Sequence, residues 1–246
     1  MPRFFVGAEQ ISDKDIVITG TDVNHIRNVL RMTPGEEVTV SDGQGMDYFC
    51  RIAELTKEEV RLDIVDSWHS FVELPTKIYL FQGLPKADKM ELIIQKAVEL
   101  GVYEIVPVAT KRAVVKLDPK KEEKKRLRWQ SIAESAAKQA GRALIPQIAP
   151  CISFEKALRM CNGLDAALIP YEKAEGMQHA RDQVRALHGK HSIGIFIGPE
   201  GGFEESEIEA ARAAGAIPIT LGHRILRTDT AGLTMLSILM FELEED

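Results

Sequence analysis

The sequence predicts an α/β protein whose mostly parallel sheet is preceded by a small β-barrel. Up to about residue 72, short strand-like runs alternate apolar and polar residues between turn sequences. From residue 73 onward, apolar strands alternate with amphipathic helices. Such alternation is typical of a parallel sheet with helices on both faces. We therefore expect two domains, residues 1–72 and residues 73–246.

The first domain is predicted from three strand-like runs, residues 37–41, 48–55 and 60–65. Turn residues separate them, as in Pro34-Gly35, and one short helix is expected at residues 22–31. A barrel is the natural closed form for such strands, because closure leaves no exposed strand edge.

The joint between the two domains is expected at residues 70–76, which contain Pro75. The expected strands of the second domain are residues 78–82, 103–108, 146–149, 166–169, 193–197 and 217–221. Its expected helices are residues 87–100, 111–140, 154–161 and 204–214, one within 177–187, and a last one from residue 230. In open parallel sheets, ligands bind at the carboxyl ends of the strands.

Composition places the chain among folded proteins that need neither disulfides nor a structural metal. Hydrophobic residues make up 45% and charged residues 28% of the 246 positions. The three cysteines are odd in number and form no CxxC pair, which argues against a zinc site and suits a reducing compartment. No apolar stretch reaches about 18 residues. We expect a cytoplasmic protein with no membrane span and no metal.

The charge pattern leaves the question of nucleic-acid binding open. A net charge of −6 speaks mildly against an RNA partner, because neutralising phosphates requires cations. Residues 111–128, however, carry nine Lys and Arg against three Asp and Glu. This segment is either a solvated charged helix or a surface that contacts RNA.

Three expected strands end in loops of unusual composition, namely residues 169–172, 198–202 and 221–230. The glycine loop, GPEGG at 198–202, matches neither the Walker nor the dinucleotide-binding spacing. Glu200 also places negative charge where a phosphate would lie. Two interpretations stay open: a tight structural turn, or a backbone platform for a ligand without phosphate.

The segment LGHRILRTDT at 221–230 favours a site. Thr228, Asp229 or Thr230 can cap the following apolar helix. Capping does not explain Arg224 and Arg227, whose side chains suit bidentate contacts with carboxylates or phosphates.

Five motifs stand out along the chain: HIRNVLRM at 25–32, DKMELIIQKAVELGV at 88–102, QAGR at 139–142, IGPEGGF at 197–203 and LGHRILRTDTAGLT at 221–234. Together they resemble the RsmE family of small-subunit ribosomal RNA methyltransferases. The resemblance spans essentially the whole chain in order. It implies a PUA-like RNA-binding barrel and a SPOUT-type methyltransferase domain with a trefoil knot, acting as a homodimer. It further implies methylation of uridine N3 in 16S ribosomal RNA with S-adenosylmethionine as the methyl donor.

The resemblance also assigns site residues. The implied cofactor loops comprise Ile169, Pro170, Tyr171, Glu172, Ile197, Gly198, Pro199, Gly201, Gly202, Leu221, Gly222, Ile225, Leu226 and Arg227. For catalysis, we hypothesise that Arg142 and Arg227 stabilise the developing uridinate, and that Glu200 or Asp229 accepts the N3 proton. The expected RNA contacts are Arg3, Arg27, Arg31, Lys111, Arg112 and Lys116. Two positions depart from the family: Asp229 replaces a usual Glu, and Ala140 replaces a frequent Cys, so no thiol chemistry is expected.

Two other functions compete with this one. A non-catalytic RNA-binding or ribosome-assembly protein could retain the same fold, but the three intact cofactor loops argue against it. An α/β nucleotide-binding oxidoreductase is disfavoured, because the dinucleotide fingerprint is missing and the glycine loop is acidic.

Overall fold

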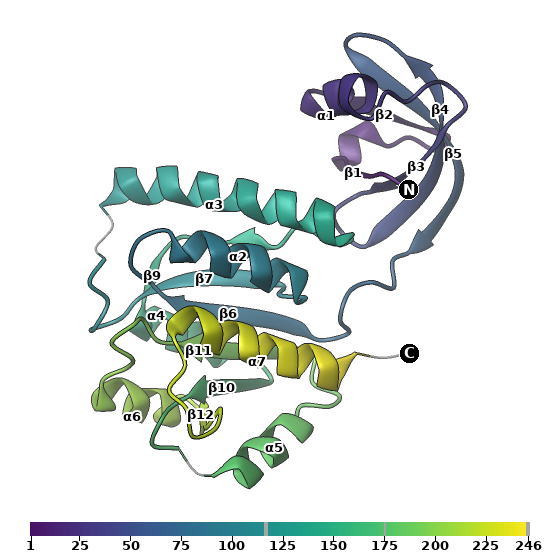
Figure 1. The fold of residues 1–246 in the computed structure, drawn as a ribbon. Helices are drawn as coiled ribbons and strands as arrows, with labels where there is room; N and C mark the ends of the chain where they lie inside the picture. The colour runs from purple at the N-terminus through teal and green to yellow at the C-terminus, as the bar shows by residue number, and fades with distance from the viewer. Residues whose placement is uncertain (116–117, 175, 245–246) are drawn as a thin grey trace. The chain divides into compact units, whose positions relative to one another are not determined.

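The computed structural model describes residues 1–115, 118–174 and 176–244 (Figure 1). The chain divides into two compact units. One unit contains Met1–Glu73 together with Ala137–Ile145, and the other contains Leu74–Ala136 and Pro146–Asp246. The short segment 137–145 therefore packs with residues that lie far from it in sequence.

The first unit is built on a curled, five-stranded mixed sheet in the order β1-β3-β4-β5-β2 (Figure 1). Its strands are β1 (Arg3–Phe5), β2 (Asp15–Thr19), β3 (Glu37–Ser41), β4 (Met46–Leu55) and β5 (Glu59–His69). β1 pairs in parallel with β3, and the other pairs are antiparallel. Closure of this sheet into a barrel stays a prediction.

The expected helix at 22–31 is shorter and less regular than the sequence suggested. α1 spans Thr21–Asn24, and a π-helical turn continues over His25–Val29. Arg31 follows with a φ of 54°, in the left-handed region that side chains rarely adopt. That conformation is incompatible with continuing a right-handed helix, so the helix stops before Arg31.

The second unit contains a seven-stranded sheet whose pairs are all parallel. The order is β12-β10-β11-β6-β7-β8, and β9 also pairs with β7. The strands are β6 (Lys77–Gly83), β7 (Glu104–Ala109), β8 (Gln147–Ile148), β9 (Ile152–Ser153), β10 (Ala166–Pro170), β11 (Ser192–Ile197) and β12 (Ile217–Ile219). The predicted parallel sheet is confirmed.

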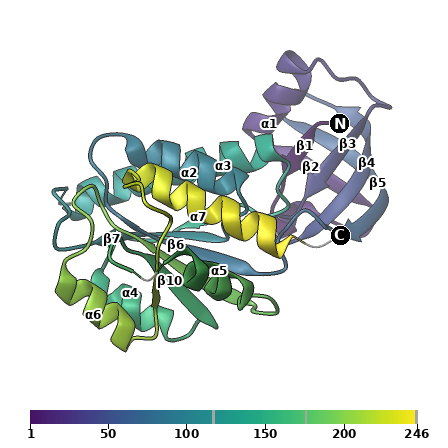
Figure 2. The same ribbon diagram turned by 60° about the horizontal axis from the view of Figure 1, so that its bottom comes forward.

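Helices cover both faces of this sheet, as expected for parallel strands. They are α2 (Lys89–Glu99), α3 (Pro119–Ala140), α4 (Phe154–Cys161), α5 (Met177–Arg185), α6 (Glu205–Ala213) and α7 (Thr228–Leu243). α2 packs against α7, and α4 packs against α6, as Figure 2 shows from a second direction. Among the described residues, no helix is long and apolar enough to cross a membrane.

Three helix starts differ by two or more residues from the sequence-based expectation. α2 begins at Lys89 rather than at residue 87. α3 begins at Pro119 rather than near residue 111, because the chain first makes a turn in which Ala113 N–H donates to the Thr110 carbonyl. The Asp118 carboxylate then accepts the Lys121 backbone N–H, which satisfies a free donor of the first turn. α7 begins at Thr228, two residues earlier than expected.

Stacked aromatic rings form the centre of the core between the sheet and α4. Phe81 of β6 lies parallel to Phe196 of β11, with ring centroids 4.4 Å apart. Phe154 of α4 meets Phe196 edge-on at 6.0 Å. Phe81 and Phe196 are each 1% exposed, so these rings join neighbouring strands to the helix layer.

We predict that Phe81→Ala lowers the free energy of unfolding by about 3 to 5 kcal/mol, because it leaves a cavity beneath Phe196. Urea denaturation would measure the loss. Phe71→Ala is the matched control, since Phe71 is 87% exposed and its truncation should cost less than about 0.5 kcal/mol. Equal losses in the two variants would contradict this account of the core.

Candidate functional site

A cavity of about 490 Å³ opens at the carboxyl ends of β10 and β12. Residues 170–172, 174, 176–177 and 220–226 line it, together with Ala231 of α7. The structure thus brings two of the three predicted ligand loops to one cavity. Its size falls within the range of about 300 to 1,000 Å³ that is usual for small-molecule sites.

The lining combines backbone groups with a few charged side chains. Glu172 offers a carboxylate and Arg224 a guanidinium. Gly222 has a φ of 109°, which favours glycine, and its N–H donates to the Thr220 hydroxyl at 3.1 Å. The loop is therefore held in a shape that brings main-chain groups to the cavity.

Two residues predicted to bind the cofactor, Ile169 and Ile197, have buried side chains at the ends of β10 and β11. Ile169 is fully buried and Ile197 is 2% exposed. Their side chains belong to the core, so any contact with a ligand must use their peptide groups.

The glycine loop at 198–202 is not part of the cavity lining among the described residues. It is instead held by basic neighbours. Glu200 accepts the backbone N–H of Lys86 at 3.1 Å and pairs with the Lys89 ammonium at 3.1 Å. The Glu200 carboxylate, whose negative charge disfavours a phosphate in this loop, thus binds residues that follow β6.

These contacts also set the ionisation of Glu200. Partial burial works to raise the pKa of its carboxyl group. Hydrogen bonds from its own and the Lys86 backbone N–H, together with the Lys89 ammonium, outweigh burial and hold the pKa below its usual value. Glu200 is therefore ionised near neutral pH and is a weak proton acceptor.

The loop after β7 also contacts the glycine loop and the start of α6. Arg112 donates from its guanidinium to the Gly201 carbonyl at 3.0 Å. The carboxylate of Glu207, which is 3% exposed, accepts the Lys111 backbone N–H at 2.9 Å. The Lys111 ammonium lies 3.4 Å from Glu204. Two predicted RNA-contacting residues thus also support the glycine loop.

The start of α7 contacts the glycine loop as well. Thr228 donates its hydroxyl proton to the Gly198 carbonyl at 2.6 Å. Arg227, just before it, is exposed and occupies the N-cap position. The Oδ1 atom of Asp229 is buried and accepts no hydrogen bond from the described residues.

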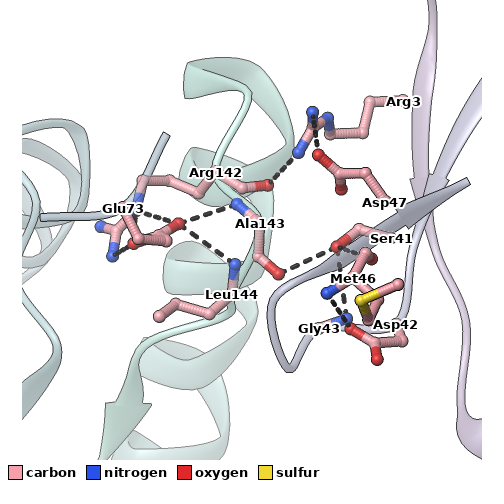
Figure 3. Close-up of polar contacts among 10 residues, drawn as sticks. All are labelled: Arg3, Ser41, Asp42, Gly43, Met46, Asp47, Glu73, Arg142, Ala143 and Leu144. Atoms are coloured by element: carbon pink, nitrogen blue, oxygen red, sulfur yellow. Dashed lines mark hydrogen bonds and ion pairs between the residues drawn. The ribbon is translucent and has the colours of Figure 1, made fainter. Parts of the chain in front are cut away.

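Arg142 lies in the first unit, in a network with Glu73 (Figure 3). Its guanidinium reaches Glu73 at 2.6 Å and is 5% exposed. Glu73 also accepts the Ala143 backbone N–H at 2.8 Å, and the Ser41 hydroxyl donates to the Ala143 carbonyl at 2.9 Å. These bonds fix the segment that carries the QAGR motif against its own unit.

The other basic residues predicted to contact RNA differ in their surroundings. Arg3 pairs with buried Asp47 at 2.9 Å and donates to the Arg142 carbonyl, as Figure 3 shows. Arg27 and Arg31 have no ion-pair partner among the described residues, and Arg31 is exposed. Lys116 lies outside the described residues.

Sequence reasoning missed several residues that hold the site together. They are Glu73, Gln82, Lys86, Lys89 and Glu207. Gln82 could have been found, because a lone amide interrupts the apolar strand sequence KIYLFQG just before a glycine. The partners of Glu73 and Glu207 lie 69 and 96 positions away in the sequence, and no local pattern reveals such pairs.

The cysteines are poor nucleophiles. Burial, aided by the Asp63 carboxylate, raises the pKa of the Cys50 thiol to about 12. Burial and the Glu122 carboxylate raise the pKa of Cys151 to about 11, and burial also raises that of Cys161. No group of three or more metal-ligating side chains occurs in the part of the chain that the structure describes.

Comparisons with known proteins identify the family of this chain. Residues 72–240 match the family described as RNA methyltransferase domain, and residues 18–65 match the family described as RNA methyltransferase PUA domain. The ribosomal RNA small subunit methyltransferase E of Bacillus subtilis is 37% identical over 99% of this chain and 98% of its own. Its counterpart in Mesomycoplasma hyopneumoniae is 33% identical over 96% of this chain and 98% of its own.

A solved structure shares the whole fold. The ribosomal RNA small subunit methyltransferase E of Neisseria gonorrhoeae, bound to S-adenosyl methionine, superposes with a TM-score of 0.84 and 34% identity. The similarity covers 98% of this chain and 97% of that one. With both units matched and full-length relatives above 30% identity, this chain belongs to the ribosomal RNA small subunit methyltransferase E family.

Proposed function

We propose that this protein transfers a methyl group from S-adenosylmethionine to N3 of a specific uridine in the 16S RNA of the small ribosomal subunit. One observation carries the proposal: two loops that follow parallel strands line a single cavity of about 490 Å³. Ligands bind at this edge of open parallel sheets. The relative from Neisseria gonorrhoeae, which is bound to S-adenosyl methionine, supports the choice of ligand.

The chemistry of the lining fits this cofactor. S-adenosylmethionine carries a sulfonium, an ammonium and a carboxylate but no phosphate. Glu172 can attract the cationic groups and Arg224 can bind the carboxylate, while backbone groups around Gly222 suit an adenine edge. When bound, S-adenosylmethionine supplies the methyl group, whose bond to sulfur breaks as its bond to N3 forms.

The chain's own residues must orient the uridine and remove its N3 proton. We assign proton acceptance to Asp229, because its buried Oδ1 has no donor among the described residues, whereas Glu200 is already hydrogen-bonded and has a lowered pKa. Exposed Arg227, next to Asp229, is placed to stabilise negative charge that develops on the base. We assign Arg142 a structural role instead, since its guanidinium already binds Glu73.

RNA binding would use exposed or half-buried cations of both units. Arg27 and Arg31 lie on the first unit, which matches an RNA methyltransferase PUA domain. Lys111 and Arg112 lie beside the glycine loop of the second unit. Phosphate contacts by such residues add affinity that falls with salt.

We further propose that the chain end is threaded as a trefoil knot, although knots are rare in proteins. The sequence resemblance implies it. The contact of Thr228 with Gly198 and the packing of α7 on β11 and α2 support it.

We propose that two copies of the chain act together, in the cytoplasm where ribosomal subunits are assembled. Two apolar side chains of α7 support a homodimer, because Phe241 is 85% exposed and Ile238 is 38% exposed. A second subunit could cover them.

The methylated atom can be identified directly. We expect the protein to methylate small subunits isolated from a strain that lacks the modification, with mass spectrometry locating the product at N3 of one uridine. Free 16S RNA would be assayed in parallel, to determine whether the protein acts on RNA alone or on assembled subunits. Methylation on a carbon or on a ribose would contradict the proposal, and failure to bind S-adenosylmethionine would favour the non-catalytic assembly protein.

The proton acceptor can be tested by single-turnover methylation at saturating cofactor. Asp229→Asn should slow the reaction by a factor of about 100 or more, because general-base assistance is usually worth that much. Glu200→Gln should slow it by less than about tenfold, since its carboxylate binds Lys86 and Lys89 instead. Glu155→Gln, which alters an exposed pair on α4, is the control. A greater loss in Glu200→Gln than in Asp229→Asn would reverse the assignment.

A further inference from the structure

A buried chain of hydrogen bonds joins β6, α7 and the glycine loop. Gln82, at the carboxyl end of β6, has no exposed surface, and Thr228 is 5% exposed. The Gln82 amide Nε2 donates to the Thr228 hydroxyl at 3.0 Å. The Thr228 hydroxyl in turn donates to the Gly198 carbonyl at 2.6 Å. One hydroxyl group thus connects three segments: Gln82 lies 146 positions before Thr228, and Gly198 lies 30 positions before it.

The direction of each bond in this chain is fixed. The Gly198 carbonyl can only accept, so Thr228 must donate its single hydroxyl proton to it. Thr228 can then only accept from Gln82, which places the amide nitrogen toward the threonine. The second amide proton goes to the Gly83 carbonyl at 2.9 Å. Because the Thr228 hydroxyl both accepts and donates, its two hydrogen bonds polarise and strengthen each other.

Backbone packing holds the same loop from the other side. A Cβ atom at Gly83 would lie 2.8 Å from the backbone nitrogen of Pro199, so only glycine lets the two segments approach this closely. Gly202 N–H donates to the Pro199 carbonyl at 2.8 Å and closes the loop into a turn. The loop is therefore held at Pro199 by packing and at Gly198 by the Thr228 hydroxyl.

We propose that Thr228, oriented by Gln82, is a positioning residue that fixes the glycine loop and the first turn of α7 in the arrangement that binds the cofactor. Thr228 lies two residues after the cavity-lining loop at 220–226 and belongs to the same helix as Ala231, which also lines the cavity. Its bond to Gly198 therefore links the cavity loop to the glycine loop. The inference rests on the proposed function, since it takes S-adenosylmethionine as the ligand.

The direct test replaces the hydroxyl without changing the shape of the side chain. Thr228→Val should weaken the binding of S-adenosylmethionine, measured by calorimetry, by about tenfold or more, because the Gly198 carbonyl and the Gln82 amide each lose their buried partner. Thr228→Ser keeps the hydroxyl and should bind within about threefold of the unaltered protein.

Thr76 provides a matched control in the same unit. Its side chain is also 5% exposed, and its hydroxyl donates to the Lys190 carbonyl at 2.7 Å, just before the start of β6. Thr76→Val removes an equivalent buried bond and should lower thermal stability without changing cofactor affinity. The comparison separates positioning of the site from a general loss of stability.

A second readout needs no cofactor. In the free protein, the backbone amides of residues 198 and 200–203 should exchange with deuterium faster in Thr228→Val than in Thr76→Val, because the loop has lost its hydrogen bond to α7. Gln82→Leu should raise exchange in the same segment, and adding it to Thr228→Val should have little further effect, since both act through one chain of bonds. Gln82→Leu also serves as the test if Thr228→Val does not fold.

The outcomes distinguish this inference from the proposed function. If the unaltered protein binds no S-adenosylmethionine, the proposed function fails while the exchange experiment still reports on the loop. If the unaltered protein binds and Thr228→Val binds equally well, or if loop exchange is unchanged, the positioning role of Thr228 is overturned.

Discussion

The parallel pairing of β11 with β6 is the constraint on which the rest of the site depends. Its register sets Ile197 opposite Gln82, so the glycine loop begins beside the end of β6. From there Gly83 can lie against Pro199, and Gln82 can reach Thr228, which holds Gly198. A shift of this strand register by one residue would move the Gln82 side chain to the other face of the sheet, where Phe81 and Phe196 stack.

The acidic glycine loop receives its positive partners from its neighbours. Glu200 binds Lys86 and Lys89 after β6, while Glu207 and the Gly201 carbonyl bind Lys111 and Arg112 after β7. Three strand-end loops are thereby fixed around one turn. The glycine loop therefore needs no lysine of its own. The negative charge of Glu200 holds neighbouring loops together and does not form part of a phosphate site.

The sequence was sufficient for the parts of the fold that depend on local pattern. Strand–helix alternation predicted the parallel sheet. The strand-end rule selected the loops at 169–172, 198–202 and 221–230, and the structure brings the first and the last of them to one cavity. It did not indicate that Arg142 would be bound by Glu73, or that Gln82 would contact Thr228, because the partners lie 69 and 146 positions apart. The late start of α3 was missed because charged residues continue from Lys111 through the turn that precedes Pro119.

The central claim is that the cavity between the loop that follows β10 and the loop at 220–226 holds the methyl donor. A crystal structure of the protein with S-adenosylmethionine tests it most directly. The account predicts the cofactor in this cavity, with its adenine against the backbone near Gly222 and its charged end toward Glu172 or Arg224. Cofactor bound elsewhere, such as the cavity of about 270 Å³ lined by Ala87 and Trp129, would contradict it.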